Sequence, residues 1–403
     1  MINKAVQFIE ELKPHTPNIF WSNLNQGVTT ASALALSIIF TRFGTLGLYG
    51  QYLFVLAMFG LFSIISIPGV RTVIFRTTSQ GYDNVYSKAT TFSFLLSLLS
   101  IPLLVAAGVF VYFFKTKILG ITLIVFALFF PFMEGLQNWM PFLKGRSEFR
   151  KLAFYNLVKI LISLIAVTLS IIFTENIIVI LAAYFLVNSG FNILYHFQSV
   201  RLLRNDKVDP EWKSQSYALT IMGLSSIIFG RVDVVLIGSL LTFEQVAIYG
   251  LVMKFADVFF SIIKSTMEAI VPNLYLSKKI TIRYFYKFFF LSFLVPIILY
   301  PIIKYPVLFL YPERCSDVVR FSKVYLAIIP FYFLNLVATY FMIKYKLNKK
   351  INIGRIISMI AVVVFYAILI PLYGIWGGVV ASMLYFITQL IINLFLLKVR
   401  EAK

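Results

Sequence analysis

The sequence predicts an all-α membrane protein with twelve transmembrane helices, and three observations lead to this fold class. First, 60% of the 403 residues are hydrophobic and only 13% are charged, whereas a soluble protein carries about 25% charged residues. Second, the chain contains twelve successive apolar runs, each near the length of about 20 residues that crosses a bilayer. Third, the basic residues are concentrated in every second loop between these runs.

The apolar runs follow one another without a polar segment long enough to form a separate soluble domain. Charged loops such as "LKGRSEFRK" and "RLLRNDKVDPEWK" separate some of them, and short turns such as "FTEN" and "PLYGI" separate others. The predicted spans are residues 18–41, 48–70, 88–114, 118–142, 152–173, 177–199, 217–241, 246–271, 284–310, 322–343, 352–371 and 374–397.

The distribution of positive charge predicts that both termini are cytoplasmic. With the N-terminus placed inside, 25 of the 36 Lys and Arg residues fall in the N-terminal segment, the inner loops and the C-terminal tail; six fall in the outer loops and five within the spans. Inner loops of membrane proteins carry such an excess. Orientation in the bilayer therefore explains the net charge of +20. The sequence shows no binding surface of combined aromatic and basic residues, so we predict no nucleic-acid partner.

The sequence contains neither a metal-binding nor an ATP-binding motif. Its one cysteine, Cys315, and its two histidines, His15 and His196, lie far apart, so no Cys/His cluster has metal-ligand spacing. A glycine-rich phosphate loop is also missing. We therefore predict no cofactor and no enzymatic activity. The N-terminal "MINKAVQFIEELKPHTPN" lacks a signal-peptide cleavage site, and its apolar face predicts an amphipathic helix on the membrane surface.

Short repeated motifs indicate that the chain is a duplication. The motif "LYG" at residues 48–50 returns as "IYG" at 248–250, and "FSII" occurs at 62–65 and at 260–263, offsets of 200 and 198 residues. Two units with an even number of helices are parallel and related by an axis along the membrane normal. We predict an N-terminal six-helix lobe with the amphipathic segment, a cytoplasmic linker and a C-terminal six-helix lobe, at residues 1–199, 200–216 and 217–403.

Charged residues inside the spans are the candidate functional residues, because an ionised side chain in hydrocarbon costs several kcal/mol, about 2.5–3.5 by insertion scales. Counted from the turn near residue 244, Arg231 is level with Asp257, and Asp233 is level with Lys254. Interhelical ion pairs that lock spans seven and eight are one interpretation. Residues two apart on a helix point about 200° apart, so one pair at most can form, and the other span-seven charge is expected to face water.

Three segments carry a family resemblance: "FGRVDVVLIGSLLTFEQVAIYGLVMKFADV" at 229–258, "LKGRSEFRKLAFYNLVKIL" at 143–161 and "IPLYGIWGGVVASMLYFI" at 370–387. The chain resembles the Wzx-type polysaccharide flippases of the multidrug/oligosaccharidyl-lipid/polysaccharide (MOP) exporter superfamily, with an aspartate in span seven and a glycine-rich start to span twelve. The resemblance implies a MATE-like fold of two six-helix bundles open in a V. It also implies alternating-access export of an undecaprenyl-pyrophosphate-linked oligosaccharide, an O-antigen, capsule or exopolysaccharide repeat unit.

The resemblance further implies a cationic central cavity that binds the anionic headgroup. Five basic residues within the spans are the candidates for this role: Arg231, Lys254, Lys264, Lys159 and Lys304. The acidic candidates for ion coupling or for structural ion pairs are Asp233, Asp257, Glu134 and Glu268. For such a protein we expect the bacterial cytoplasmic (inner) membrane as its location, and a polysaccharide polymerase and a chain-length regulator as partners.

Two other functions stay open at this point. A cation-coupled multidrug exporter of the same fold would use acidic residues to bind organic cations, but the excess of basic residues within the spans argues against it. A membrane glycosyltransferase or polymerase would normally carry a large outer loop with catalytic carboxylates. The longest outer loop, "YPERCSDVVRFSK", is short.

Overall fold

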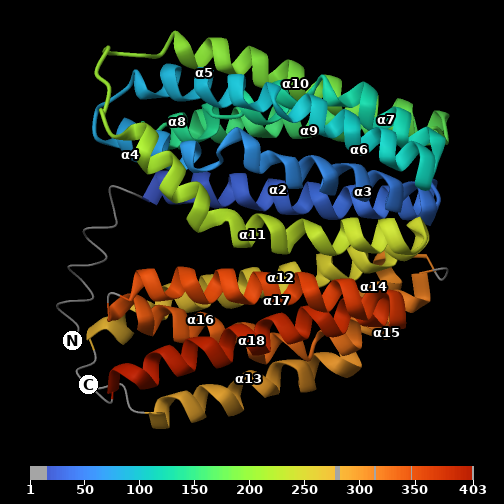
Figure 1. The fold of residues 1–403 in the computed structure, drawn as a ribbon, viewed down its shortest axis with the longest axis vertical. Coiled ribbons are helices and arrows are strands. Elements are labelled where there is room, and N and C mark those ends of the chain that lie inside the picture. The colour runs from blue at the N-terminus through green and yellow to red at the C-terminus, as the bar shows by residue number, and fades with distance from the viewer. Residues whose placement is uncertain (1–15, 277–281, 313–314, 346, 402–403) are drawn as a thin grey trace. The chain divides into compact units, whose positions relative to one another are not determined.

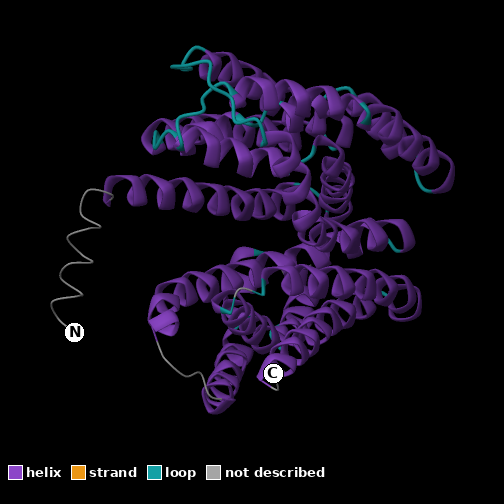
Figure 2. Cartoon of the chain, turned by 60° about the vertical axis from the view of Figure 1, so that its left-hand side comes forward, coloured by secondary structure: helices purple, strands orange, loops and turns teal. Residues whose placement is uncertain are grey.

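The computed structural model describes residues 16–276, 282–312, 315–345 and 347–401. Helices make up nearly all of this part of the chain, and it contains no β-strand (Figures 1 and 2). The predicted amphipathic segment at the N-terminus falls almost entirely outside the described residues. The all-α prediction is confirmed.

The helices follow one another with short connections. The first part of the chain contains α2 (Thr16–Phe43), α3 (Leu46–Phe62), the 3₁₀ turn η2 (Ser63–Ser66), α4 (Gly69–Ser79), α5 (Val85–Leu98), α6 (Ser100–Phe114), α7 (Lys117–Ala127), the π-helical turn η3 (Pro131–Gly135), α8 (Trp139–Gly145), α9 (Phe149–Phe173) and α10 (Ile177–Val200). The remainder contains α11 (Trp212–Leu240), α12 (Phe243–Leu276), α13 (Ile282–Ile302), α14 (Lys304–Leu310), α15 (Ser316–Tyr325), α16 (Ile328–Lys344), α17 (Asn348–Tyr373) and α18 (Ile375–Glu401).

The number of membrane-spanning segments agrees with the sequence. Within the described ranges, nine helices are long and apolar enough to cross a bilayer, and the number reaches twelve if each of three bent helix pairs is one span. The bent pairs are α7 with η3 and α8, the end of α13 with α14, and α15 with α16. The chain is therefore a multi-pass membrane protein.

Prolines account for the positions at which the three bent spans break. The bends are 51°, 51° and 41°. A proline has no N–H for the carbonyl four residues earlier, and its ring crowds that carbonyl, so the helical hydrogen bonding is interrupted there. In each bent span a proline lies four residues after the point where the first helix ends. That point is the last residue of the helix in two spans and the residue after it in the third. These pairs are Ala127 with Pro131, Ile302 with Pro306, and Leu326 with Pro330.

The helices form two compact units. Unit 1 consists of Met1–Gly44 and Met58–Gly223, and unit 2 consists of Thr45–Ala57 and Leu224–Lys403. As a result α3 and α11 each contribute residues to both units. The predicted division into lobes 1–199 and 217–403 with a linker at 200–216 stays a prediction.

One end of unit 1 has an aromatic core that orders the loops around it. Tyr86 of α5 stacks on Phe142 of α8, with ring centres 4.4 Å apart, and both side chains are fully buried. Trp139 and Trp212 belong to the same buried cluster. This core joins α4, α5, α8 and the start of α11 within one unit.

A buried ion pair attaches the predicted linker to unit 1. The guanidinium of Arg146 lies 3.2 Å from the carboxylate of Asp83, and each side chain is only 6% exposed. The same carboxylate accepts the backbone N–H of Arg204 at 2.9 Å, and Arg146 also donates to the carbonyl of Leu202. These contacts hold the segment between α10 and α11 against the loops that follow α4 and α8.

The two copies of "FSII" have different structures. In the first copy Phe62 ends α3 and the next three residues enter η2. Ile67 then takes a left-handed conformation with φ of 53°, just before Pro68. In the second copy the same four residues lie inside the uninterrupted α12. A residue before proline is disfavoured in the helical region, and α12 meets no proline until Pro272.

The repeated "L/I-Y-G" motif brings two helices of unit 2 into close contact. A Cβ atom added to Gly50 of α3 would lie 1.7 Å from the carbonyl oxygen of Phe243, at the start of α12. A Cβ added to Gly250 of α12 would lie 2.4 Å from the Leu53 side chain of α3. Close helix approach therefore requires glycine at position 50, where the neighbour is backbone, whereas at Gly250 the Leu53 side chain would have to move. Small residues permit such close approach in membranes.

Candidate functional site

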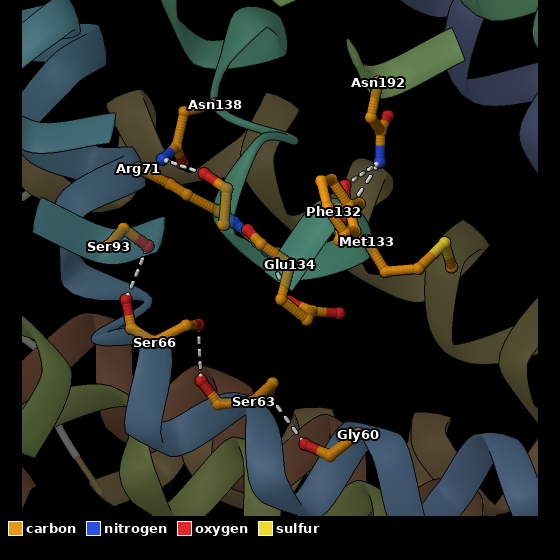
Figure 3. A network of polar contacts seen from close by, with 11 residues as sticks. Gly60, Ser63, Ser66, Arg71, Ser93, Phe132, Met133, Glu134, Asn138 and Asn192 are labelled. Atoms are coloured by element: carbon orange, nitrogen blue, oxygen red, sulfur yellow. Dashed lines mark hydrogen bonds and ion pairs between the residues drawn. The ribbon is translucent and has the colours of Figure 1, made fainter. Parts of the chain in front are cut away.

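A group of polar and charged side chains meets inside unit 1, and we call these five residues the unit 1 cluster. Its members come from five elements: Arg71 on α4, Glu134 on η3, Trp139 on α8, Lys159 on α9 and Asn192 on α10. Figure 3 shows Arg71, Glu134 and Asn192 around the turn at η3. Two cations and one carboxylate give the unit 1 cluster a net positive charge.

Glu134 is positioned by the break in its span. After Pro131 the chain forms one π-helical turn, in which backbone carbonyls leave the regular helical pattern; such turns are frequent at functional sites. An unsatisfied carbonyl in the membrane interior costs several kcal/mol. The amide of Asn192 prevents this cost by donating to the carbonyls of Phe132 and Met133, at 3.2 and 3.1 Å (Figure 3).

Arg71 forms an ion pair with Glu134. Its Nη2 atom lies 2.6 Å from Glu134 Oε2 and also contacts the backbone carbonyl of Glu134 at 3.5 Å (Figure 3). Arg71 stands near the start of α4, directly after the left-handed Ile67 and Pro68 that separate α4 from η2. The two side chains are 36% and 21% exposed, so this ion pair is accessible at the surface of the unit.

Lys159 is the buried cation of the unit 1 cluster. It stands ten residues after the first residue of the 25-residue helix α9, about 15 Å along its axis, and is only 5% exposed. Its ammonium lies 5.4 Å from the centre of the Trp139 ring. Among the described side chains no carboxylate comes within 4.0 Å of it. The charges of Arg71 and Glu134 act on it from a greater distance.

Asn192 connects the two parts of the unit 1 cluster. Its side-chain oxygen accepts the indole N–H of Trp139 at 3.2 Å, while its nitrogen donates to the η3 carbonyls. One amide therefore orients the ring beside Lys159 and supports the turn that carries Glu134. Asn192 is 1% exposed, which leaves its donors and acceptor committed to these partners.

A polar stripe extends from Lys159 along α9. Asn156 donates to the side-chain oxygens of Asn25 and Thr29 on α2, at 2.9 and 3.2 Å. Ser163 accepts the amide of Asn188 on α10 at 2.9 Å. Asn156, Lys159 and Ser163 are three and four residues apart, so they share one face of α9. This face provides hydrogen-bonding groups from Asn156 to Ser163, about a third of the length of the 25-residue helix.

Unit 2 contains a second buried polar network, centred on Asp233. Asp233 is 2% exposed; one carboxylate oxygen accepts the Tyr249 hydroxyl at 2.9 Å, and the other accepts the Val234 N–H at 2.7 Å. The Tyr249 hydroxyl also contacts the Ser382 hydroxyl at 3.1 Å, and the Tyr366 hydroxyl contacts Ser382 at 2.9 Å. Helices α11, α12, α17 and α18 are joined by this network.

The remaining predicted residues do not gather at one point. Arg231, Lys264, Lys304 and Asp257 are exposed, and Lys254 is half-buried. Neither of the two ion pairs considered for spans seven and eight occurs among these described side chains, because Tyr249 and a backbone N–H occupy the carboxylate of Asp233. The side chain of Glu268 lies outside the described part.

Sequence reasoning missed several members of these networks. Arg71 directly follows the predicted second span, residues 48–70, and so falls among the 25 basic residues on the inner side, whose positions orientation in the bilayer explains. Tyr249 is the central residue of the "IYG" motif, which indicated a repeat but not a partner for Asp233. The sequence does not mark Trp139 and Asn192 as members of a site, because aromatic and amide side chains in apolar spans commonly serve packing and local hydrogen bonding.

The histidine and acidic residues do not form a metal centre in the described ranges. No group of three or more His, Cys, Asp or Glu side chains there is arranged to hold a metal ion. His196 instead has its Nδ1 atom 2.9 Å from the Tyr86 hydroxyl.

Three solved membrane transporters have a fold similar to that of the chain. The lipid II flippase MurJ, in an inward closed conformation, matches with a TM-score of 0.67 and 14% identity, over 94% of this chain and 87% of that one. An inward-facing multidrug resistance MATE family transporter of the MOP superfamily matches with 0.64 and 14% identity, over 93% and 96%. A MOP superfamily transporter from Pyrococcus furiosus matches with 0.58 and 14% identity, over 92% of each chain.

The sequence itself identifies the family. No curated protein matches the chain. Residues 39–278, more than half of the chain, match the family described as "Polysaccharide biosynthesis protein". The chain therefore belongs to the polysaccharide biosynthesis protein family, and it has the fold of the MOP superfamily transporters.

Proposed function

We propose that this protein is a flippase that moves an undecaprenyl-pyrophosphate-linked oligosaccharide across the bacterial cytoplasmic membrane by alternating access. The family match and the flippase and transporter folds support a transport role rather than catalysis. A diphosphate headgroup needs a polar path with compensating positive charge, because an unpaired charge in hydrocarbon is costly.

The observation that carries the proposal is the buried ammonium of Lys159. A lysine halfway along a membrane helix, 5% exposed and with no carboxylate within 4.0 Å among the described residues, lacks the counter-charge that buried ions require. The Trp139 face supplies only part of it, since a cation–π contact contributes about 0.5–2 kcal/mol. An anionic ligand would complete the site.

The other predicted residues take their roles within this proposal. Arg231, Lys254, Lys264 and Lys304 are further candidates to contact the diphosphate or the negatively charged groups of the sugar. The amide-rich face of α9 and α2 is suited to sugar hydroxyls, which amides bind as both donors and acceptors. Both termini would be cytoplasmic, and a polymerase and a chain-length regulator would act on the exported lipid.

Reconstitution tests the proposal directly. Purified protein is placed in liposomes that contain a fluorescent polyprenyl-diphosphate oligosaccharide, and the fraction accessible to an external glycosidase is followed over time. We expect transfer between leaflets that protein-free liposomes do not show. The same lipid without its diphosphate, as a neutral polyprenyl glycoside, should move far more slowly. Absence of transfer under every imposed proton or sodium gradient would contradict the proposal.

The Asp233 network favours a second candidate, a cation-coupled multidrug exporter. Asp233 is buried without a basic partner within 4.0 Å among the described side chains, so a transported cation or a proton could balance its charge. Resistance to cationic drugs on overexpression, lost in Asp233→Asn and kept in Lys159→Met, would favour this candidate over the flippase. Lipid transfer that depends on Lys159 would favour the flippase.

A further inference from the structure

We infer that Glu134 is an internal competitor of the anionic ligand for Arg71, and this inference rests on the flippase proposal. The carboxylate of Glu134 pairs with the guanidinium that a diphosphate would bind. On binding, the diphosphate takes the place of the carboxylate, and Arg71 joins Lys159 in one anion site.

The geometry of the ion pair supports an exchange of partners. A single Arg71 nitrogen contacts Glu134 Oε2 at 2.6 Å, and the same nitrogen reaches the Glu134 carbonyl at 3.5 Å. Among the described carboxylates, none besides Glu134 lies within 4.0 Å of the Arg71 guanidinium. A guanidinium binds phosphate oxygens through two parallel hydrogen bonds, so a diphosphate offers Arg71 a better-matched acceptor than this one-nitrogen contact.

The exposure of the charged groups sets the order of events. Arg71 and Glu134 are 36% and 21% exposed, whereas Lys159 is 5% exposed. An anion that approaches unit 1 therefore meets the Arg71–Glu134 pair before it reaches Lys159. Lys159 is in turn within electrostatic range of both members of that pair, so release of Arg71 changes the charge that surrounds it.

The local backbone allows Glu134 to move without unfolding the span. Glu134 lies on a single π-helical turn, between α7 and α8 rather than inside either helix. Asn192 supports this turn through the carbonyls of Phe132 and Met133, not through Glu134 itself. The carboxylate can therefore rotate away from Arg71 while the turn keeps its hydrogen bonds.

Diphosphate binding to the purified full chain tests the inference. Titration calorimetry with farnesyl diphosphate and with inorganic pyrophosphate separates a lipid headgroup from a free anion. We expect Glu134→Gln to tighten binding about tenfold, the effect of losing one competing charge-assisted hydrogen bond, and Arg71→Gln and Lys159→Gln to weaken it. Glu175→Gln, which removes an exposed carboxylate of the same unit, should leave binding unchanged and controls for net charge.

A double variant distinguishes exchange from a simple field effect. If Glu134→Gln tightens binding only when Arg71 is present, Glu134 competes for that residue. The inference would be overturned if Glu134→Gln tightened binding equally in the Arg71→Gln background, or if Glu134→Gln alone left the affinity unchanged. In either case the flippase proposal would stand as long as the unaltered protein binds and transfers the lipid. Diphosphate binding that is tightened by Glu134→Gln without any lipid transfer would instead remove the flippase proposal and keep the competition. Thermal unfolding of each variant confirms that it is folded.

Discussion

The ammonium of Lys159 lies 5.4 Å from the centre of the Trp139 ring, and the indole N–H of that ring is held by Asn192. A helix of otherwise apolar character thus carries a buried cation whose position is set by two neighbouring helices, α8 and α10. A residue kept for stability alone would not need this arrangement, because an apolar side chain of the same length packs without a desolvation cost.

We expect Lys159→Met to abolish lipid transfer, whereas the thermal stability of the protein stays the same or increases. Methionine has a similar length and removes only the buried charge, whose replacement by an apolar group is often neutral or stabilising by about 1–4 kcal/mol. Transfer in proteoliposomes and the Tm in detergent measure the two effects. Lys117→Met removes an exposed lysine of the same unit and should change neither. A fall in both transfer and Tm for Lys159→Met would indicate a structural role instead.

Asn192→Leu should destabilise unit 1 and reduce transport together. The change removes three hydrogen bonds, to Phe132, Met133 and the Trp139 indole, and side-chain hydrogen bonds within membranes contribute about 0.6 kcal/mol each. A loss of about 2 kcal/mol is therefore expected, measured as a lower denaturant midpoint. Asn23→Leu, at an exposed position of α2, is the matched control, and an equal loss there would argue against a special role for Asn192.

Asp83→Ala should cost far more stability than a similar change at the surface. It removes the closer of the two carboxylates that pair with the guanidinium of Arg146, which is only 6% exposed and keeps Glu148 at 3.4 Å. Loss of one partner of a buried ion pair costs about 3–5 kcal/mol, and the remaining carboxylate places the expected loss at the lower end of that range. In the control, Asp209→Ala removes a partner of Arg76, which is 44% exposed, so at most about 1 kcal/mol is expected. Equal shifts in Tm would show that the linker contact is not stabilising. Limited proteolysis between Arg201 and Glu211 offers an independent measurement.

Gly50→Ala should prevent correct packing of α3 on α12. The added methyl group would lie 1.7 Å from the backbone oxygen of Phe243, and a backbone atom cannot move aside as a flexible side chain can. We expect a large loss of folded protein in detergent, measured by size-exclusion chromatography. Gly190→Ala adds the same methyl group with nothing within 4 Å, and should fold normally. Normal yield of Gly50→Ala would contradict the close contact.

Composition and the pattern of apolar runs are enough to predict the class of the protein and the number of its spans. Apolar runs of about 20 residues can satisfy their backbone hydrogen bonds in a bilayer only as helices, so composition and periodic polar breaks are sufficient to predict an all-α membrane fold. The three bent spans break where a proline removes a helical hydrogen bond, but Pro296, Pro301 and Pro371 lie inside helices, so proline alone does not locate the breaks. The cost of ionised groups in spans makes Lys159, Glu134 and Asp233 candidates, and their roles stay a prediction.

Helix packing sets which of these groups come into contact. Depth counted along two helices placed Asp233 level with Lys254, but rotation about the helix axis and packing place the Tyr249 hydroxyl on its carboxylate instead. Arg71 was counted with the loops because it follows a span, yet the left-handed residue before α4 brings it to Glu134. Contacts between residues far apart in the chain depend on how helices pack, and a one-dimensional pattern carries no information about that rotation.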